Sequence, residues 1–119
     1  MAVASLAEER VRILLEQLDI RYQREYIFQD LRGKYGDHLR FDYAIFDDEG
    51  NLHCLLELQG EQHYKAFPHF GGEKGYAKQR YYDNLKEQYC KKHNIKLVKI
   101  PYYNFDYIND ENLLKAINL

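Results

Sequence analysis

Two apolar segments joined by a turn-forming stretch constrain this chain more than any other part of its sequence. The segments Leu39 to Asp47 and Leu52 to Gln59 have the composition of β-strands. Between them, Asp47-Asp48-Glu49-Gly50-Asn51 is typical of a turn. We therefore expect a β-hairpin in the middle of the chain.

The predicted hairpin brings two acidic residues together. A turn centred in the acidic stretch sets Asp42 opposite Glu57 and Asp47 opposite Leu52, and strand alternation places Gln59 on the same face as Glu57. Opposed carboxylates repel, and a compensating cation such as Mg²⁺ or Mn²⁺ suits their oxygen atoms. The alternative is that both acids are solvated on an exposed sheet face. A register slip of one residue would separate the pair.

The remaining elements follow from hydrophobic periodicity and from turn and capping signals. A helix is expected to begin at Ser5, which suits an N-cap because Glu8 follows three residues later. The predicted order αβββαβα describes an α/β domain over residues 1–119, with a mixed β-sheet of about four strands flanked by helices. Beyond the hairpin, the expected elements are helix Ser5 to Leu18, strand Tyr22 to Gln29, loop Gly60 to Gly72, helix Glu73 to His93, strand Ile95 to Ile100 and helix Asp110 to Asn118.

Composition narrows the class of protein. With 119 residues, 45% hydrophobic and 30% charged, the chain matches one compact domain and not a disordered segment. No apolar run approaches the roughly 18 to 20 residues that span a bilayer, and Glu8 interrupts the apolar start. We expect a cytoplasmic protein with no membrane partner, in which Cys54 and Cys90 are small buried hydrophobes.

The charges are unevenly distributed along the chain. The net charge of −2 excludes a uniformly basic surface. Residues 1–63 carry 7 basic and 13 acidic side chains, residues 64–100 carry 9 and 3, and residues 101–119 carry 1 and 3. Tyrosines interleave the basic block, a mixture that suits phosphate contacts and base stacking, but the block on its own is explained better by a solvated helix face with tyrosines packed inward. The candidate DNA-binding cations are Lys65, Lys74, Lys78, Arg80 and Lys86.

The acidic hairpin belongs to a series of motifs that resembles a known enzyme superfamily. The motifs, in chain order, are Ser5-X-X-Glu8, Leu39-Arg40-Phe41-Asp42-Tyr43, Glu57-Leu58-Gln59-Gly60-Glu61-Gln62-His63-Tyr64, Asp83-X-X-Lys86-X-X-Tyr89-Cys90 and Ile95-Lys96-Leu97-Val98-Lys99-Ile100-Pro101-Tyr102. They cover most of the chain. Together they resemble the PD-(D/E)XK nuclease superfamily, and within it the branch of very-short-patch repair endonucleases and phage homing endonuclease catalytic domains.

The resemblance implies a restriction-endonuclease-like core and a hydrolase that cuts DNA with a divalent metal. It implies that Asp42 and Glu57 bind Mg²⁺ or Mn²⁺ and that Glu8 acts as a ligand or a water-positioning acid. His63 would be a general base or acid, and the Gln-His-Tyr context favours this role over the alternative of an exposed loop histidine. The Asp83-X-X-Lys86 motif matches a family helix position near the site.

Gln59 departs from the family pattern. Close relatives usually have Asp at this catalytic position and the wider superfamily usually has Lys, whose ammonium helps to orient the attacking water and to stabilise developing charge. Gln is neutral and only donates or accepts hydrogen bonds. The sequence therefore predicts an endonuclease or nickase with DNA as its partner, and it leaves a catalytically inactive DNA-binding or inhibitory module as the alternative. So short a catalytic domain also allows a homodimer.

Overall fold

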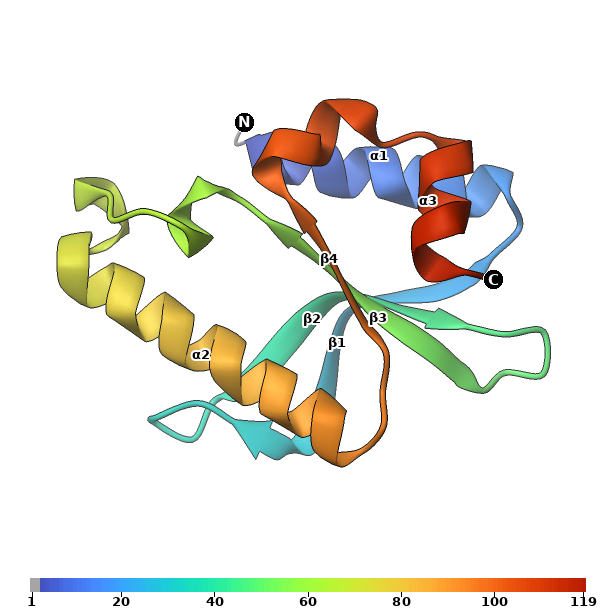
Figure 1. Cartoon of the computed structure of the whole chain (residues 1–119). Coiled ribbons are helices and arrows are strands. Elements are labelled where there is room, and N and C mark those ends of the chain that lie inside the picture. Colours follow the sequence, from blue (N-terminus) through green and yellow to red (C-terminus); the bar gives the residue numbers. More distant parts are fainter. Residues whose placement is uncertain (1–2) are drawn as a thin grey trace.

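One mixed β-sheet organises residues 3–119, the part of the chain that the computed structural model describes (Figure 1). The sheet order is β1-β2-β3-β4, with antiparallel β1–β2 and β2–β3 pairs and a parallel β3–β4 pair. The strands are β1 (Arg21–Arg32), β2 (His38–Phe46), β3 (Leu52–Gln59) and β4 (Leu97–Pro101). The helices are α1 (Val3–Gln17), α2 (Gly72–Lys92) and α3 (Asp110–Ile117), with 3₁₀ turns η1 (Glu61–His63), η2 (Pro68–Phe70) and η3 (Tyr102–Tyr107).

The predicted α/β class, element order and mixed four-stranded sheet are confirmed, and β3 has the predicted bounds. The predicted helix start is wrong. The helix already begins at Val3, so Ser5 lies inside α1 and is not its N-cap; nothing in Val3 or Ala4 breaks a helix. β1 is also longer than predicted, because it runs on to Arg32 to pair with His38.

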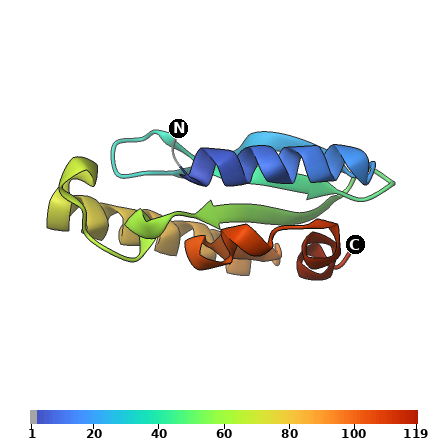
Figure 2. The same cartoon turned by 90° about the horizontal axis from the view of Figure 1, so that it is seen from above.

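The sheet separates two hydrophobic cores. On one face, α1 and α3 cover buried side chains that include Tyr43 and Leu56. On the other face, α2 covers a second cluster that includes Phe41 and Leu55. Figure 1 shows α1 and α3 above the strands and α2 below them, and in Figure 2, seen from above, α1 lies in front of the strands. Because both faces are covered, β3 is almost continuously buried.

The hairpin register is mostly as predicted. Tyr43 pairs with Leu56 and Ile45 with Cys54, as expected from a turn in the acidic stretch. The predicted pairing of Asp47 with Leu52 is wrong: Leu52 pairs with Phe46, because the register shifts at the end of the hairpin. The Asp47 side chain instead accepts hydrogen bonds from backbone N–H groups of the turn.

The cysteines and the helices test two further predictions from the sequence. Cys54 and Cys90 are buried free thiols, as predicted, and burial raises the pKa of each to about 11. No helix within residues 3–119 has the length and apolar character needed to cross a membrane.

The hydroxyl of Tyr43 joins α1 to the sheet, which predicts a measurable cost when it is removed. The ring is fully buried and its Oη donates a 2.6 Å hydrogen bond to the backbone oxygen of Glu8. Tyr43→Phe should lower the free energy of unfolding by about 1 kcal/mol, and Tyr43→Ala by about 3 to 5 kcal/mol. Urea unfolding followed by circular dichroism measures both values; equal stability of Tyr43→Phe and wild type would contradict the role of this bond.

Candidate active site

The candidate site lies where β2 and β3 separate. Their last pair is Tyr43 with Leu56, and the next step of the same register would set Asp42 opposite Glu57. Beyond that point β3 stays paired only with β4. The Leu58 backbone N–H donates a 2.7 Å hydrogen bond to Asp42 Oδ2, so the carboxylate takes the place of a backbone acceptor. Asp42 and Glu57 thus approach each other, as predicted, directly after the last residue pair of β2 and β3.

The backbone of β1 is distorted next to Asp42. Arg24 pairs with Tyr43 and Tyr26 with Phe41, but Glu25 between them has a φ of 51°. This left-handed conformation is rare for a residue with a side chain and costs on the order of 1 to 3 kcal/mol. It turns the strand over: Tyr22 packs on the α1 side of the sheet, whereas Tyr26 packs on the α2 side.

Glu57 is a buried carboxylate with a lysine ammonium beside it. The residue is 6% exposed, and burial raises the pKa of Glu57 to about 7 although the charge of Lys86 opposes the shift. Lys86 Nζ, from α2, donates a 2.8 Å hydrogen bond to Glu57 Oε1. The same ammonium lies 5.3 Å from the centre of the buried Phe41 ring. Lys86 therefore points into the site, away from the other lysines of α2.

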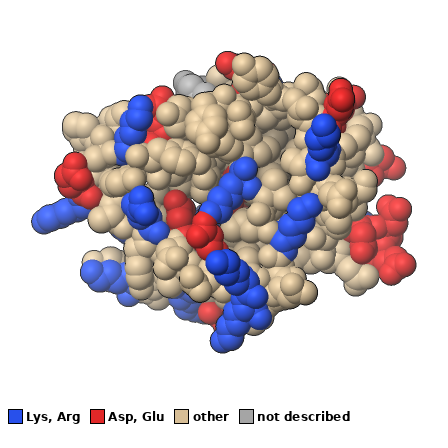
Figure 3. Space-filling view, viewed as in Figure 1, with Lys and Arg blue, Asp and Glu red and all other residues tan. Residues whose placement is uncertain are grey.

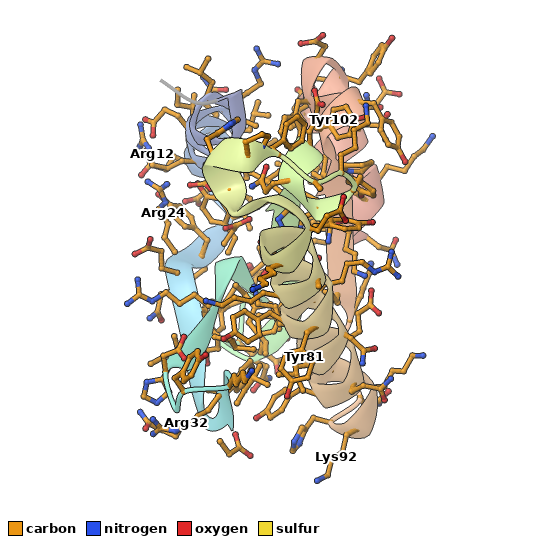
Figure 4. All side chains as sticks on the ribbon, turned by 90° about the vertical axis from the view of Figure 1, so that its left-hand side faces the viewer. Arg12, Arg24, Arg32, Tyr81, Lys92 and Tyr102 are labelled. Atoms are coloured by element: carbon orange, nitrogen blue, oxygen red, sulfur yellow. The ribbon has the colours of Figure 1, made fainter. Side chains whose placement is uncertain are left out.

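Asp42 and Glu8 complete a group of three carboxylates that affect one another. Burial raises the pKa of Asp42, opposed by the Leu58 N–H bond and the positive charge of Lys86. Partial burial and the negative charge of Asp42 raise the pKa of Glu8. Arg24 Nη2 lies 3.3 Å from Glu8 Oε2 and partly offsets that rise. Figure 4 shows Arg24 on the α1 side of the molecule.

His63 is oriented by a carboxylate of α2. Its Nδ1 lies 2.9 Å from Asp83 Oδ2, and Gln79 Nε2 donates a 3.1 Å bond to the other oxygen of Asp83. The His63 and Asp83 side chains are 10% and 18% exposed. A neutral or protonated imidazole with Nδ1–H held in this way presents Nε2 for proton exchange. His63 is thus a positioned histidine and not an exposed loop residue.

Gln59 is buried and already engaged. It is 6% exposed, and the Tyr64 hydroxyl donates a 2.7 Å hydrogen bond to its Oε1. Gln59, His63 and Asp83 line a cavity of about 520 Å³ between η1, α2 and β4. The wall of this cavity also carries Tyr64, Tyr76, Arg80, Tyr81 and Lys99.

The predicted DNA-binding cations separate into two groups. Lys65 lies in the segment after η1, and Lys74, Lys78 and Arg80 lie in the first half of α2. Lys86 instead bonds to Glu57. In Figure 3, blue side chains are spread over the α2 side of the face with acidic groups among them, and red groups gather over the β2–β3 turn.

Sequence reasoning missed two basic residues near the site. Arg24 lies two residues after Tyr22 and therefore on the α1 side of β1, where it reaches Glu8; the strand pattern alone does not say which of its faces lies next to α1. Lys34 lies beside α2. Its place in a glycine-flanked turn next to Tyr35 is the sequence signal that marks it as an exposed cation.

The donor chemistry of the site fits a hard divalent cation. Asp42 and Glu57 supply carboxylate oxygens, and the hydrogen bonds described above use one oxygen of each. Burial raises both pKa values and so disfavours the charged form of each carboxylate, which a bound cation would stabilise. Within residues 3–119, no three His, Cys, Asp or Glu side chains are already gathered as a ligand set.

The raised pKa of Glu57 predicts that stability falls as pH rises. The pKa of Glu57 is about 7 in the folded protein, against an ordinary value of 4.5. Between these two pH values the folded protein binds the proton more tightly than the unfolded chain does. The free energy of unfolding therefore decreases as pH rises through this range. Relative to Glu57→Gln, wild type should lose on the order of 2 to 3 kcal/mol between about pH 4 and pH 8. Urea unfolding at both pH values measures this difference. Asp48→Asn, at an exposed turn position, is the matched control. Its difference from wild type in free energy of unfolding should be the same at both pH values. If the difference between Glu57→Gln and wild type is also the same at both, the assignment is contradicted.

Comparison with known proteins provides one viral relative. The chain is 42% identical over 68 residues to the uncharacterized protein 307L of Invertebrate iridescent virus 6. The match covers 56% of this chain and 34% of the viral protein, so the chain spans about a third of that relative. No family model and no solved structure matches the chain.

Proposed function

We propose that this chain is a divalent-metal-dependent endonuclease or nickase that hydrolyses DNA phosphodiester bonds, built on a core like that of the PD-(D/E)XK nucleases. The observation that carries the proposal is the convergence of the half-buried Asp42 and the buried Glu57 where β2 and β3 separate, both with raised pKa values. Carboxylates buried in this way at a strand end are costly to the fold, and a functional site is the usual reason to keep them.

Asp42 and Glu57 would hold the metal, with Glu8 as a further ligand or as an acid that orients water. Mg²⁺ or Mn²⁺, when bound, supplies Lewis-acid activation of the phosphate. Arg24 beside Glu8 limits the negative charge on the α1 side. The protein therefore contributes a site whose oxygen donors come from α1, β2 and β3.

His63 is the proposed general base or acid. Asp83 holds its Nδ1, so Nε2 is the atom that would exchange a proton with water or with the leaving oxygen. Gln79 keeps the carboxylate of Asp83 in place. This arrangement fixes the orientation of the imidazole ring that proton transfer requires.

Lys86 is proposed to supply the cation that Gln59 does not. Its ammonium comes from α2 and not from β3, yet it contacts Glu57 at 2.8 Å. A fixed ammonium at this point would stabilise negative charge that develops on the phosphate. The cations Lys65, Lys74, Lys78 and Arg80 would contact the DNA backbone outside the site.

An inactive DNA-binding or inhibitory module is the second candidate. The observation in its favour is that Lys86 occupies one oxygen of Glu57 while Tyr64 occupies the amide oxygen of Gln59. In that case the ion pair would replace the metal as the compensating charge, and the basic residues would bind DNA without cleavage.

Nicking of supercoiled plasmid tests the proposed activity. Wild type with Mg²⁺ or Mn²⁺ should convert the plasmid to open-circular or linear DNA, and Asp42→Asn and Glu57→Gln should each lose about 10²-fold or more of the rate. Asp42→Asn retains an oxygen that can accept the Leu58 N–H bond, so it preserves the fold. His63→Ala should lower the rate by about 10² to 10⁴-fold.

Asp48→Asn is the matched control for the nicking assay, since this carboxylate is exposed on the β2–β3 turn and should leave the rate unchanged. Circular dichroism verifies that each variant is folded. DNA binding by wild type without cleavage in either metal would refute the nuclease and support the binding module.

The assigned role of Lys86 predicts a rescue. Lys86→Gln should reduce nicking by about 10² to 10³-fold, and the double variant with Gln59→Lys should regain part of that rate, because alternation puts residue 59 on the face of Glu57. Measuring the nicking rate over a range of metal concentrations distinguishes a Lys86 that assists cleavage from one that competes with the metal for Glu57. If Lys86 merely competes with the metal, Lys86→Gln will be as fast as wild type at a lower metal concentration.

A further inference from the structure

A second cleft lies on the far side of α2 from β4. It has a volume of about 480 Å³ and lies between the β1–β2 turn and α2. Three lysines line it, Lys34 from the turn and Lys74 and Lys78 from α2. Within the described part of the chain its lining contains no carboxylate. The cleft is therefore more cationic than the cavity around His63, where Asp83 and Glu87 face Arg80 and Lys99.

Tyrosine rings are interleaved with these lysines. Tyr35 is 79% exposed and Tyr81 is 49% exposed, so both rings present area that the protein does not cover. Lys34 Nζ lies 5.8 Å from the centre of the Tyr35 ring, and Lys78 Nζ lies 5.4 Å from that of Tyr82. Exposed aromatic rings beside cations are the combination that binds single-stranded nucleic acid, through base stacking and phosphate contacts.

The cleft adjoins the candidate active site. Ala77 and Tyr81 line both this cleft and the cavity that contains His63 and Asp83. Figure 4 shows Tyr81 on the side of α2 that faces the viewer. A strand whose bases stack on Tyr35 and Tyr81 would thus continue toward His63.

We propose that this cleft binds unpaired nucleotides of the DNA strand next to the site of cleavage, so that the substrate class is DNA with a single-stranded segment. The inference rests on the proposed nuclease function. The lysines alone would bind double-stranded DNA equally well, because a duplex presents its phosphates outward. The rings of Tyr35 and Tyr81 favour unpaired DNA, since the faces of paired bases are already stacked within the helix.

Fluorescence anisotropy with labelled oligothymidylate of about 15 nucleotides and a blunt duplex of equal length tests the proposal. The assay contains EDTA, so binding is measured without cleavage. Wild type should bind the single strand at least about tenfold more tightly than the duplex. Tyr35→Ala and Tyr81→Ala should each weaken single-strand binding by about 5- to 100-fold, and Lys34→Ala should reduce the slope of log K against log salt by about 0.7.

Tyr107→Ala is the matched control, because Tyr107 is 66% exposed on η3 and lies outside this cleft. It should bind like wild type. Equal affinity for single strand and duplex, or losses at Tyr35 and Tyr81 no larger than at Tyr107, would overturn the proposal. Single-strand binding without plasmid or single-strand cleavage in Mg²⁺ would instead refute the nuclease function and leave the cleft assignment standing.

Discussion

The hydrogen bond from the Leu58 backbone N–H to the Asp42 carboxylate fixes the point at which the sheet opens. A buried N–H without an acceptor costs on the order of 1 to 3 kcal/mol, and at this point β3 has lost its backbone partner on the β2 side. The side chain of Asp42 supplies the missing acceptor, so β2 can leave β3 without that cost. Glu57 and Lys86 meet beside this opening.

The charges at the opening are balanced from both faces of the sheet. Arg24, next to α1, partners Glu8, and Lys86, from α2, partners Glu57. Asp42 lies between the two pairs, and its hydrogen bond is to a neutral backbone group. Burial raises the pKa of Asp42, and the charges of both Lys86 and Arg24 oppose that rise, so the two cations act on the same carboxylate from opposite faces of the sheet.

Much of the fold was predictable because it depends on local chemistry. The turn and the strand alternation specify the hairpin register, except at its end, where a bulge moves Leu52 onto Phe46. The partners of the acidic site were not predictable in this way. The helical pattern does not distinguish Lys86 from the surface lysines of α2, and nothing in the sequence signals the left-handed Glu25 that turns β1 over. Both depend on packing between segments far apart in the chain.

The parallel pairing of β3 with β4 has a consequence for the order of folding. The antiparallel hairpin closes locally, but β4 reaches β3 only after the chain has crossed through α2. Until that crossover docks, Glu57 has no ammonium beside it, and Asp42 and Glu57 repel each other across an open hairpin. The Lys86–Glu57 contact therefore requires that the crossover has docked, and the acidic site is complete only when α2 lies against the sheet.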